Sequence, residues 1–264
     1  MKKATIVYFS HGGGPLPILG DQSHQAMINF MRDLPTKITR PEKILVISAH
    51  WEEHEVTLMA AEKPVMFYDY YGFLEEAYSI TYPAPGDPEL ATEIALMLNG
   101  HKIPAHFDPV RGFDHGLFIP LKMMYPEADI PCLQMSLLHS LDPAAHIALG
   151  KGLHDLLDEN ILVIGSGFSF HNLSAFFNQV HPRADADNDM FQDWLIETCA
   201  GEGLSMAERE NRLVNWENAP NSRFCHPREE HLLPLLVCAG MAGEPGKVIF
   251  DDKILNKRAL AFLW

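Results

Sequence analysis

The chain has 264 residues, of which 47% are hydrophobic and 21% charged, so it is long enough for a sizeable buried core and has an ordinary globular composition. Its formal net charge of −15 argues against nucleic acid as a partner, because a polyanion is bound by clustered lysine and arginine side chains. No apolar run approaches the ~20 residues that a bilayer-spanning helix needs, so we expect no membrane partner.

The N-terminus and the cysteines bear on the compartment. Met1-Lys2-Lys3 runs straight into a strand-like segment, without the apolar region and cleavage site of a secretory signal. The four cysteines are scattered and form no CxxC pair, which favours a reduced compartment over disulfides or a thiolate zinc site. We therefore expect a cytoplasmic protein.

Short apolar segments rich in β-branched residues alternate with longer segments of helical periodicity. The predicted strands, in chain order, are residues 4–10, 44–48, 56–59, 131–136, 161–166, 247–250 and 260–263. The predicted helices are residues 88–98, 117–124, 143–157, 188–199, 205–214 and 229–239. This alternation predicts an α/β fold: one domain over residues 1–264, with a central, mostly parallel sheet flanked by helices on both faces. The aromatic-rich loop 62–72 is predicted to be a lid or a pocket wall.

Three histidines follow predicted strands, and they are the first candidates for a site. His11 comes after IVYFS, His50 after ILVISA, and His171 shortly after ILVIGS. The carboxyl ends of parallel strands line one crevice in such a sheet, so these side chains can converge on a cation. Neutral imidazole is a good ligand for zinc and for ferrous iron. A lone histidine in such a place is more often an ordinary polar residue, and only the set of three favours a metal site.

Two further histidines lie in loops that lead into predicted helices. His115 follows Asp114, although adjacency in sequence does not show that this carboxylate orients the imidazole. Glu230-His231 is predicted to open the helix over residues 229–239. We assign no role to the remaining polar-segment histidines, which are His24, His54, His101, His106, His139, His146, His154 and His181.

Two common site motifs are absent. The glycines after His11, in HGGGPLP, do not have the spacing of a dinucleotide-binding loop and are better suited to a sharp backbone turn. The segment GSGFS is not the GxSxG of a serine hydrolase.

The chain resembles the class III extradiol ring-cleavage dioxygenases, and among them the DOPA-type branch. The resemblance runs nearly end to end and rests on seven motifs in order, which are FSHGGGPLPILGD, VISAHWE, YDYYGF, TYPAPGDPELA, RGFDHGLFIPLKMMYPEADIPCLQMSL, IGSGFSFHNL and REEHLLPLL. One departure lies at the last motif, where the family often has Thr-Pro-Glu-His and this chain has Pro227-Arg228-Glu229-Glu230-His231.

The resemblance implies one divalent metal per chain, Fe(II) for activity, with Zn(II) able to occupy the same site. It implies ligands at His11, His50 and His231, with Glu230 left open as an alternative third ligand. His171 would be either a further ligand or the acid/base that moves the catechol protons. His115 would line the substrate pocket and bind the substrate or a developing oxyanion. Tyr68, Tyr70 and Tyr71 are expected to wall the ring pocket, and Arg111 or Lys122 could pair a substrate carboxylate.

The expected activity is therefore extradiol cleavage of a DOPA-like catechol, with the aromatic diol and O₂ as substrates. Three other functions stay open at this point. They are a zinc protein of the same fold without dioxygenase activity, as in the related Memo-type proteins, a metal-dependent hydrolase that needs no O₂, and a plain α/β binding protein. The sequence does not indicate the regiochemistry of cleavage or the oligomeric state.

Overall fold

The computed structural model describes residues 4–177 and 182–264. The strands are β1 (Thr5–Ser10), β2 (Lys43–Glu53), β3 (Val56–Met59), β4 (Ala105–Asp108), β5 (Cys132–Leu138), β6 (Ile161–Gly167), β7 (Lys247–Ile254) and β8 (Lys257–Leu263). The α-helices are α1 (Gln25–Lys37), α2 (Pro88–Gly100), α3 (His115–Met124), α4 (Pro143–Gly152), α5 (Leu173–Phe177), α6 (Ala184–Ala200), α7 (Met206–Val214), α8 (Ser222–Cys225) and α9 (Leu233–Ala242). Short 3-10 helices are η1 (Gln22–His24), η2 (Glu75–Ser79), η3 (His154–Asp158) and η4 (Trp216–Asn218).

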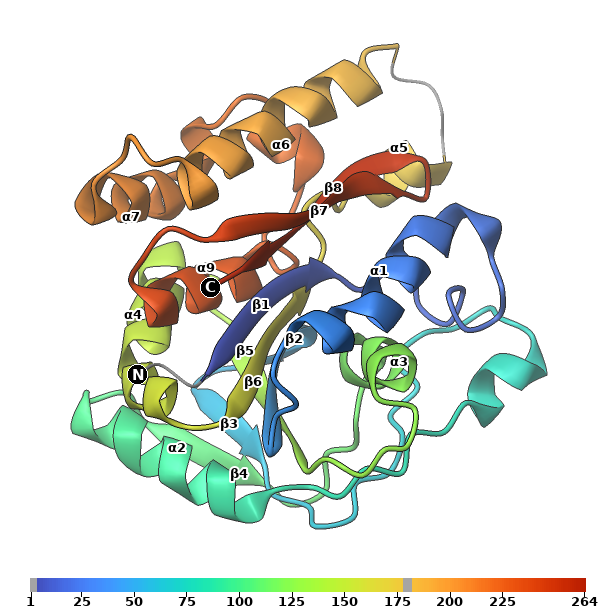
Figure 1. The fold of residues 1–264 in the computed structure, drawn as a ribbon, viewed down its shortest axis with the longest axis vertical. Helices are drawn as coiled ribbons and strands as arrows, with labels where there is room; N and C mark the ends of the chain where they lie inside the picture. The colour runs from blue at the N-terminus through green and yellow to red at the C-terminus, as the bar shows by residue number, and fades with distance from the viewer. Residues whose placement is uncertain (1–3, 178–181) are drawn as a thin grey trace.

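The strands of the described residues form one sheet in the order β4-β3-β5-β2-β6-β1-β8-β7, which runs through the middle of Figure 1. The central strands β5, β2, β6 and β1 are parallel to one another. The outer pairs β1–β8, β7–β8 and β3–β5 are antiparallel, and β3–β4 is again parallel. The expectation of an α/β fold around a mostly parallel sheet is confirmed.

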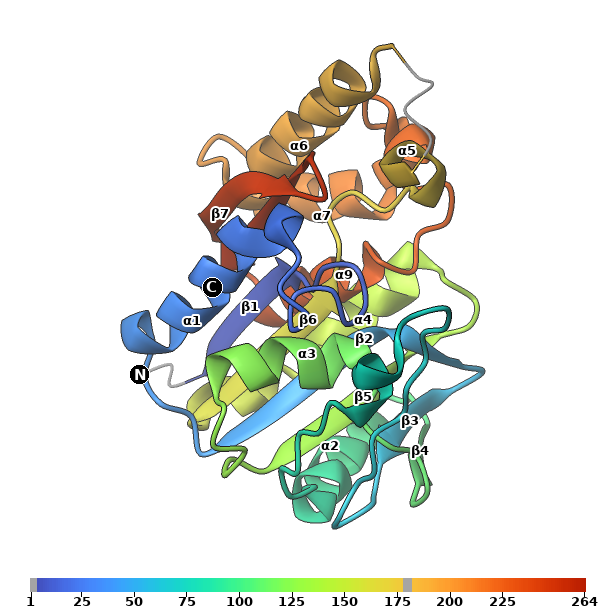
Figure 2. The ribbon, with the colours of Figure 1, turned by 90° about the vertical axis from the view of Figure 1, so that its right-hand side faces the viewer.

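Helices cover both faces of this sheet, as expected. Successive strand residues point to opposite faces, and two neighbours in β6 show which helix lies on each. A Cβ on Gly165 would lie 2.7 Å from the carbonyl oxygen of Pro234 in α9. The next residue, Ser166, donates a hydrogen bond to the carbonyl oxygen of Gly116 in α3. Figures 1 and 2 show α1 beside α3 on one side of the sheet, and α4 beside α9 on the other.

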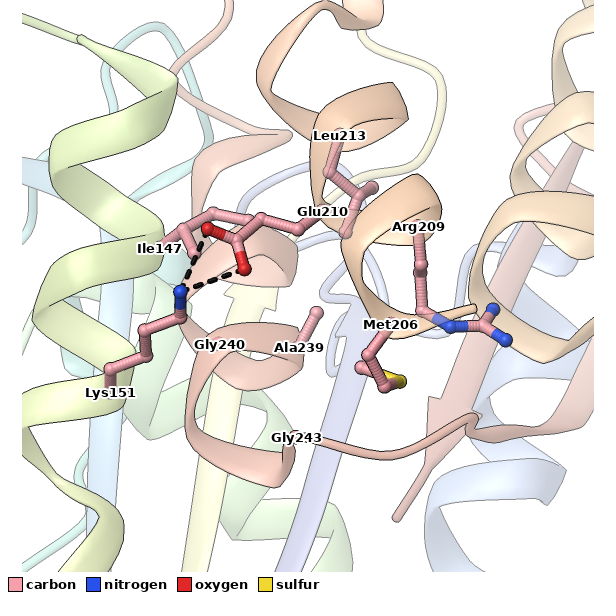
Figure 3. A pocket seen from close by; sticks show the side chains of 9 residues that line it. All are labelled: Ile147, Lys151, Met206, Arg209, Glu210, Leu213, Ala239, Gly240 and Gly243. Carbon is pink, nitrogen blue, oxygen red and sulfur yellow. Dashed lines mark hydrogen bonds and ion pairs between the residues drawn. The ribbon is translucent and has the colours of Figure 1, made fainter. Parts of the chain in front are cut away.

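On the face of the sheet covered by α4 and α9, a small hollow lies between α4, α7 and α9, with a volume of about 140 Å³ (Figure 3). Its walls include Ile147, Met206 and Leu213. The Lys151 ammonium spans it to reach both oxygens of Glu210 at 2.7 Å. This ion pair joins α4 to α7.

The predicted elements were mostly found, with the following differences. Helix α1 and strand β4 were missed, as were the short helices α5 and α8. The predicted helix 143–157 was wrong as a single element, because α4 ends at Gly152 and η3 follows. The predicted helix 188–199 begins earlier, at Ala184.

The helix predicted over residues 229–239 begins instead at Leu233, so Glu230 and His231 lie in the turn before it and do not open it. Pro234 gives the physical reason. A proline has no N–H to donate to the preceding helical turn, so it fits the first turn of a helix and would disrupt the interior. Among the described residues, none of the helices is both long and apolar enough to pass through a membrane.

Candidate metal centre

Three imidazoles converge at the carboxyl edge of the parallel strands. One ring nitrogen each of His11, His50 and His231 lies within 4.8 Å of the others. The Nε2 atoms of His11 and His50 are only 3.0 Å apart. His11 and His231 are buried, whereas His50 is partly open to solvent. The convergence expected from the strand ends is therefore present, although the third imidazole comes from the turn before α9 and not from His171.

The backbone around each imidazole explains this placement. His11 directly follows β1, and Gly12 then turns the chain with a φ of +88°, a conformation that glycine adopts without strain. The sequence predicted that His50 follows a strand, but it lies inside β2. Pairing of β2 with β6 stops at Ser48, and the register with β5 shifts between Ile47 and Glu52. This irregularity frees His50 from the ladder and directs it to the sheet edge.

The turn that carries His231 is fixed through its own carbonyl oxygen. The Tyr8 hydroxyl in β1 and the Phe168 amide just after β6 both donate to this oxygen, each at 3.0 Å. A Cβ on Gly167 would stand 2.1 Å from the same atom, so only glycine permits this approach. The turn is therefore held against the ends of the two central strands.

The outer nitrogen of His11 is fixed by Ser166. The Ser166 hydroxyl donates its hydrogen to the Gly116 carbonyl at 2.5 Å, and it lies 2.9 Å from Nδ1 of His11. Because a hydroxyl has one hydrogen to donate, Nδ1 of His11 must be the donor in the second contact. Nε2 of His11 then presents a lone pair to the other imidazoles.

Asp69 performs the same task for two histidines. Its carboxylate accepts from Nδ1 of His115 at 2.8 Å and from the backbone amide of the same residue at 3.1 Å. It also lies 3.4 Å from Nδ1 of His50. Asp114, the acid next to His115 in sequence, turns away and accepts hydrogen bonds from Ser48 and Arg111. The carboxylate that orients His115 is thus remote in sequence.

Glu230 makes a second bridge of this kind. Its Oε1 lies 2.9 Å from Nδ1 of His231 and 3.1 Å from Nδ1 of His171. The rings of those two histidines are stacked, with centroids 3.4 Å apart. Each carboxylate therefore joins one imidazole of the converging set to one imidazole beside it. Because a carboxylate only accepts, the Nε2 atoms of all four rings carry lone pairs when the rings are neutral.

The charges agree with this arrangement. Burial, with the neighbouring imidazoles adding to it, holds the pKa of His11, His50 and His231 well below the usual histidine value. Burial would raise the pKa of Asp69, but the His115 hydrogen bond and the two nearby imidazoles lower it to about 2. Burial would likewise raise the pKa of Glu230, but the contact with His171 lowers it below its usual value. The ligand candidates are neutral and the carboxylates behind them are ionised.

This donor set fits a divalent metal ion. Two Nε2 lone pairs 3.0 Å apart repel each other unless a cation or a shared proton lies between them. In zinc and iron sites, the metal is commonly bound by neutral imidazoles, and the other N–H of each imidazole is commonly bound to a carboxylate. Ligation from one side leaves positions open to a pocket.

The pocket above these imidazoles has a volume of about 430 Å³, within the range of small-molecule sites. His115 and His171 line it together with the three converging histidines. Tyr70 and Tyr71 also line it, so the loop 62–72 forms part of the wall, as expected. Tyr68 is not among the lining residues, and its hydroxyl donates to the carbonyl oxygen of Ile80.

Most other histidines have local structural partners. His24, left unassigned from the sequence, is buried and accepts a hydrogen bond from the Gly13 amide, which holds the glycine loop. His146 accepts from the Leu138 amide, and His106 contacts Glu55. His226 donates from Nε2 to the carbonyl oxygen of Ser169 and is fully buried. His181 lies outside the described residues.

Sequence reasoning missed the partners behind the imidazoles, namely Ser166 and Asp69. Asp69 offered a signal as the one acid of the YDYYGF motif, but nothing there linked it to His115. Ser166 was hidden in a buried strand, where a serine needs a hydrogen-bond partner.

Comparison with known proteins decides the family. A sequence model described as the catalytic LigB subunit of aromatic ring-opening dioxygenase matches residues 5–259. The chain belongs to this family. The dioxygenase is 38% identical to "Dioxygenase tasH" of Hapsidospora irregularis, over all of this chain and 86% of that protein. It is also 38% identical to "4,5-DOPA dioxygenase extradiol" of Beta vulgaris, over 91% of this chain and 87% of the relative.

A solved structure agrees with the fold of the dioxygenase. It is a crystal structure of an uncharacterized protein from Escherichia coli K12, with a TM-score of 0.77, 29% sequence identity, and coverage of 98% of both chains. The protein is thus an extradiol ring-cleaving dioxygenase, an oxidoreductase whose family implies a divalent metal, an aromatic substrate and O₂. Neither the hydrolase nor the plain binding protein finds support among these relatives.

Proposed function

We propose that this dioxygenase uses Fe(II), held by Nε2 of His11, His50 and His231, to cleave the ring of a catechol with O₂. The observation that carries the ligand set is the convergence of these three neutral imidazoles. When bound, the metal supplies Lewis acidity toward the catechol oxygens and a site at which O₂ meets the substrate. Zinc could fill the same three nitrogens, but it has no redox chemistry to offer O₂.

Glu230 is less suited than His231 to be the third ligand. Its Oε1 is already engaged by two imidazole N–H groups, and it lies behind His231 as seen from His11 and His50. We therefore assign Glu230 the role of a carboxylate that orients His231 and His171. His171 as a fourth ligand of a resting metal stays a prediction from the family resemblance.

His171 is our candidate acid/base. Glu230 holds its Nδ1 hydrogen, so the free lone pair of its Nε2 can accept the proton of a catechol hydroxyl and later return it to the ring-opened product. The ionised Glu230 stabilises the imidazolium in between. His115, with Nδ1 fixed by Asp69, presents Nε2 to the pocket and can hydrogen-bond a substrate oxygen.

The substrate is inferred from similarity, and the location is inferred from the cysteines. The name of the Beta vulgaris relative, 4,5-DOPA dioxygenase extradiol, supports a DOPA-like catechol with a substituent on the ring. Four free, buried cysteines support a cytoplasmic location. We further propose that residues 1–264 are one catalytic domain, because strands from both ends of the chain share one sheet.

The test is O₂ uptake by protein reconstituted anaerobically with Fe(II), using a panel of catechols that includes DOPA. We expect stoichiometric uptake with a yellow ring-fission product, and loss of at least 100-fold in kcat for His171→Ala. His101→Ala, an exposed histidine at the end of α2, is the matched control and should keep full activity. No uptake with any catechol, despite one bound iron per chain, would contradict the proposal. Zinc-loaded protein should take up no O₂.

A further inference from the structure

The mouth of the pocket is apolar and open to solvent. Apart from its histidines and glycines, all the described side chains that line the pocket are leucine, phenylalanine or tyrosine. Three of them are largely exposed: Tyr71 is 91% exposed, Leu173 58% and Phe177 71%. Exposed apolar side chains gathered at one opening mark a surface that a ligand covers.

The described side chains that line this mouth carry no charge, since no lysine, arginine, aspartate or glutamate is among them. Arg111 and Lys122, the cations that could have paired a substrate carboxylate, are engaged elsewhere. Arg111 contacts Asp114 and the His50 carbonyl from behind, and Lys122 donates to the Thr81 carbonyl. Neither lines the pocket.

Two further polar side chains, one in the wall and one near it, are engaged by other partners. The Tyr70 hydroxyl donates to the Ala77 carbonyl at 2.6 Å, inside the loop to which it belongs. Arg228, beyond the histidines, forms a two-pronged ion pair with Glu52. A carboxylate or ammonium group on the substrate would thus lose water at this mouth without gaining an ion-pair partner among the described lining residues.

We propose that this mouth is a binding site for the ring substituent of the catechol, and that it binds an uncharged, apolar substituent more tightly than the amino-acid side chain of DOPA. In this respect the lining of the mouth departs from the DOPA-like substrate that the name of the Beta vulgaris relative supports. The inference rests on the proposed function, since it takes the diol to lie against the converging histidines. The pocket, at about 430 Å³, has room for more than the ring, and the chain beyond the ring would pack on Leu173, Phe177 and Tyr71. Burial of each methylene there should tighten binding about fourfold.

The first test measures binding without turnover. Zinc-loaded protein is titrated under argon, by calorimetry, with catechol, 4-methylcatechol, 4-ethylcatechol, 4-propylcatechol, 3-(3,4-dihydroxyphenyl)propionate and DOPA. We expect the Kd to fall with each added methylene. The propionate and 4-propylcatechol are close in length, and we expect the propionate to bind at least tenfold more weakly than 4-propylcatechol. DOPA or the propionate binding as tightly as 4-propylcatechol would overturn the inference.

The second test reverses the selectivity. Leu173→Lys places a cation at the mouth and should shift the kcat/KM ratio of the propionate to 4-propylcatechol by at least tenfold toward the propionate. Phe177→Lys, one helical turn further along α5, should act in the same direction and serves if the first variant does not fold. Leu96→Lys on α2 is the matched control, because Leu96 is 69% exposed and does not line the pocket. An unchanged ratio in both folded mouth variants would overturn the inference.

The two proposals can fail separately. Preferred cleavage of DOPA over 4-propylcatechol would overturn the apolar selectivity and leave ring cleavage standing. Absence of O₂ uptake with every catechol would contradict the proposed function, while the affinities measured on the zinc-loaded protein would still decide whether the mouth selects apolar substituents.

Discussion

At the scale of single residues, the chemistry of each imidazole depends on the group that holds its outer nitrogen. Asp69 is the clearest case, because one partly buried carboxylate serves both His50 and His115. Removing its charge would leave the shape of the site nearly unchanged but weaken its hold on the tautomer of both rings. His11 and His50 could be chosen from the sequence because each comes late in or just after an apolar strand run, whereas His231 was chosen through the family resemblance. Asp69 could not, because it lies 46 positions from His115 and Asp114 was the nearer candidate.

We predict that Asp69→Asn lowers kcat by about 10–100-fold, the usual effect of removing a partner of a metal-binding histidine. The effect should fall on kcat more than on KM, since the proposed role of His115 is toward the reacting oxygens. Steady-state kinetics and zinc titration of the same samples check this. Asp155→Asn, an exposed acid in η3, should match the parent protein in both. Wild-type kcat in the Asp69 variant would contradict the role given to this carboxylate.

At the scale of elements, the contact between β6 and the turn before α9 sets the position of His231. Strand β6 and helix α9 were both predicted, because the run ILVIGS and the apolar segment around LLPLLVCAG are easily recognised in the sequence. The start of α9 was placed too early, since periodicity continues into the turn and the significance of Pro234 was overlooked. Strand β4 was missed because it is only four residues long, lies at the sheet edge and buries no side chain fully. Helix α1 was missed although its buried Met27, Met31 and Leu34 have helical spacing.

We predict that Gly167→Ala weakens metal binding at least tenfold and lowers stability by about 2 kcal/mol, because the new methyl group would overlap the His231 carbonyl oxygen. Zinc titration and urea unfolding measure the two effects. Gly203→Ala is the matched control, since nothing lies within 4 Å of the added methyl group there. Equal zinc affinity in the two variants would show that the turn can move without loss of the site.

At the scale of the whole molecule, stability is coupled to protons through buried neutral histidines. His226 contacts the rings of Phe191 and Trp216, and burial lowers its pKa to about 3. In the unfolded chain its pKa is about 6.5. The unfolded state therefore binds the extra proton below pH 6.5, so the contribution of His226 to stability is complete above that pH and is lost progressively as the pH falls toward 3.

We predict that the free energy of unfolding of metal-free protein falls between pH 7.5 and pH 5.5, and that His226→Gln reduces this loss by about 1.4 kcal/mol. Glutamine retains an N–H donor for the Ser169 carbonyl oxygen but does not titrate. Urea unfolding at the two pH values gives the comparison. An identical pH dependence in the two proteins would mean that His226 is not held neutral in the folded state.

Fold class could be predicted for the whole molecule because strand and helix patterns alternate throughout most of the chain. The order of strands could not, because pairing of β3 and β4 beside β5, and of β7 and β8 beside β1, depends on contacts between distant segments. For the same reason only one part of the pocket mouth, the tyrosine loop, was predicted. It is assembled from the first glycine loop, the tyrosine loop, α5 and Leu255 in the turn between β7 and β8.

The positions of the converging histidines also have a consequence for biosynthesis. His11 and His50 leave the ribosome well before His231 and the turn that carries it. Under the proposed ligand set, a nascent chain offers only a weak two-nitrogen site until that turn has been made. Metal acquisition would therefore follow synthesis of the turn before α9, and a prematurely terminated product that lacks this turn would compete poorly for the cellular metal supply.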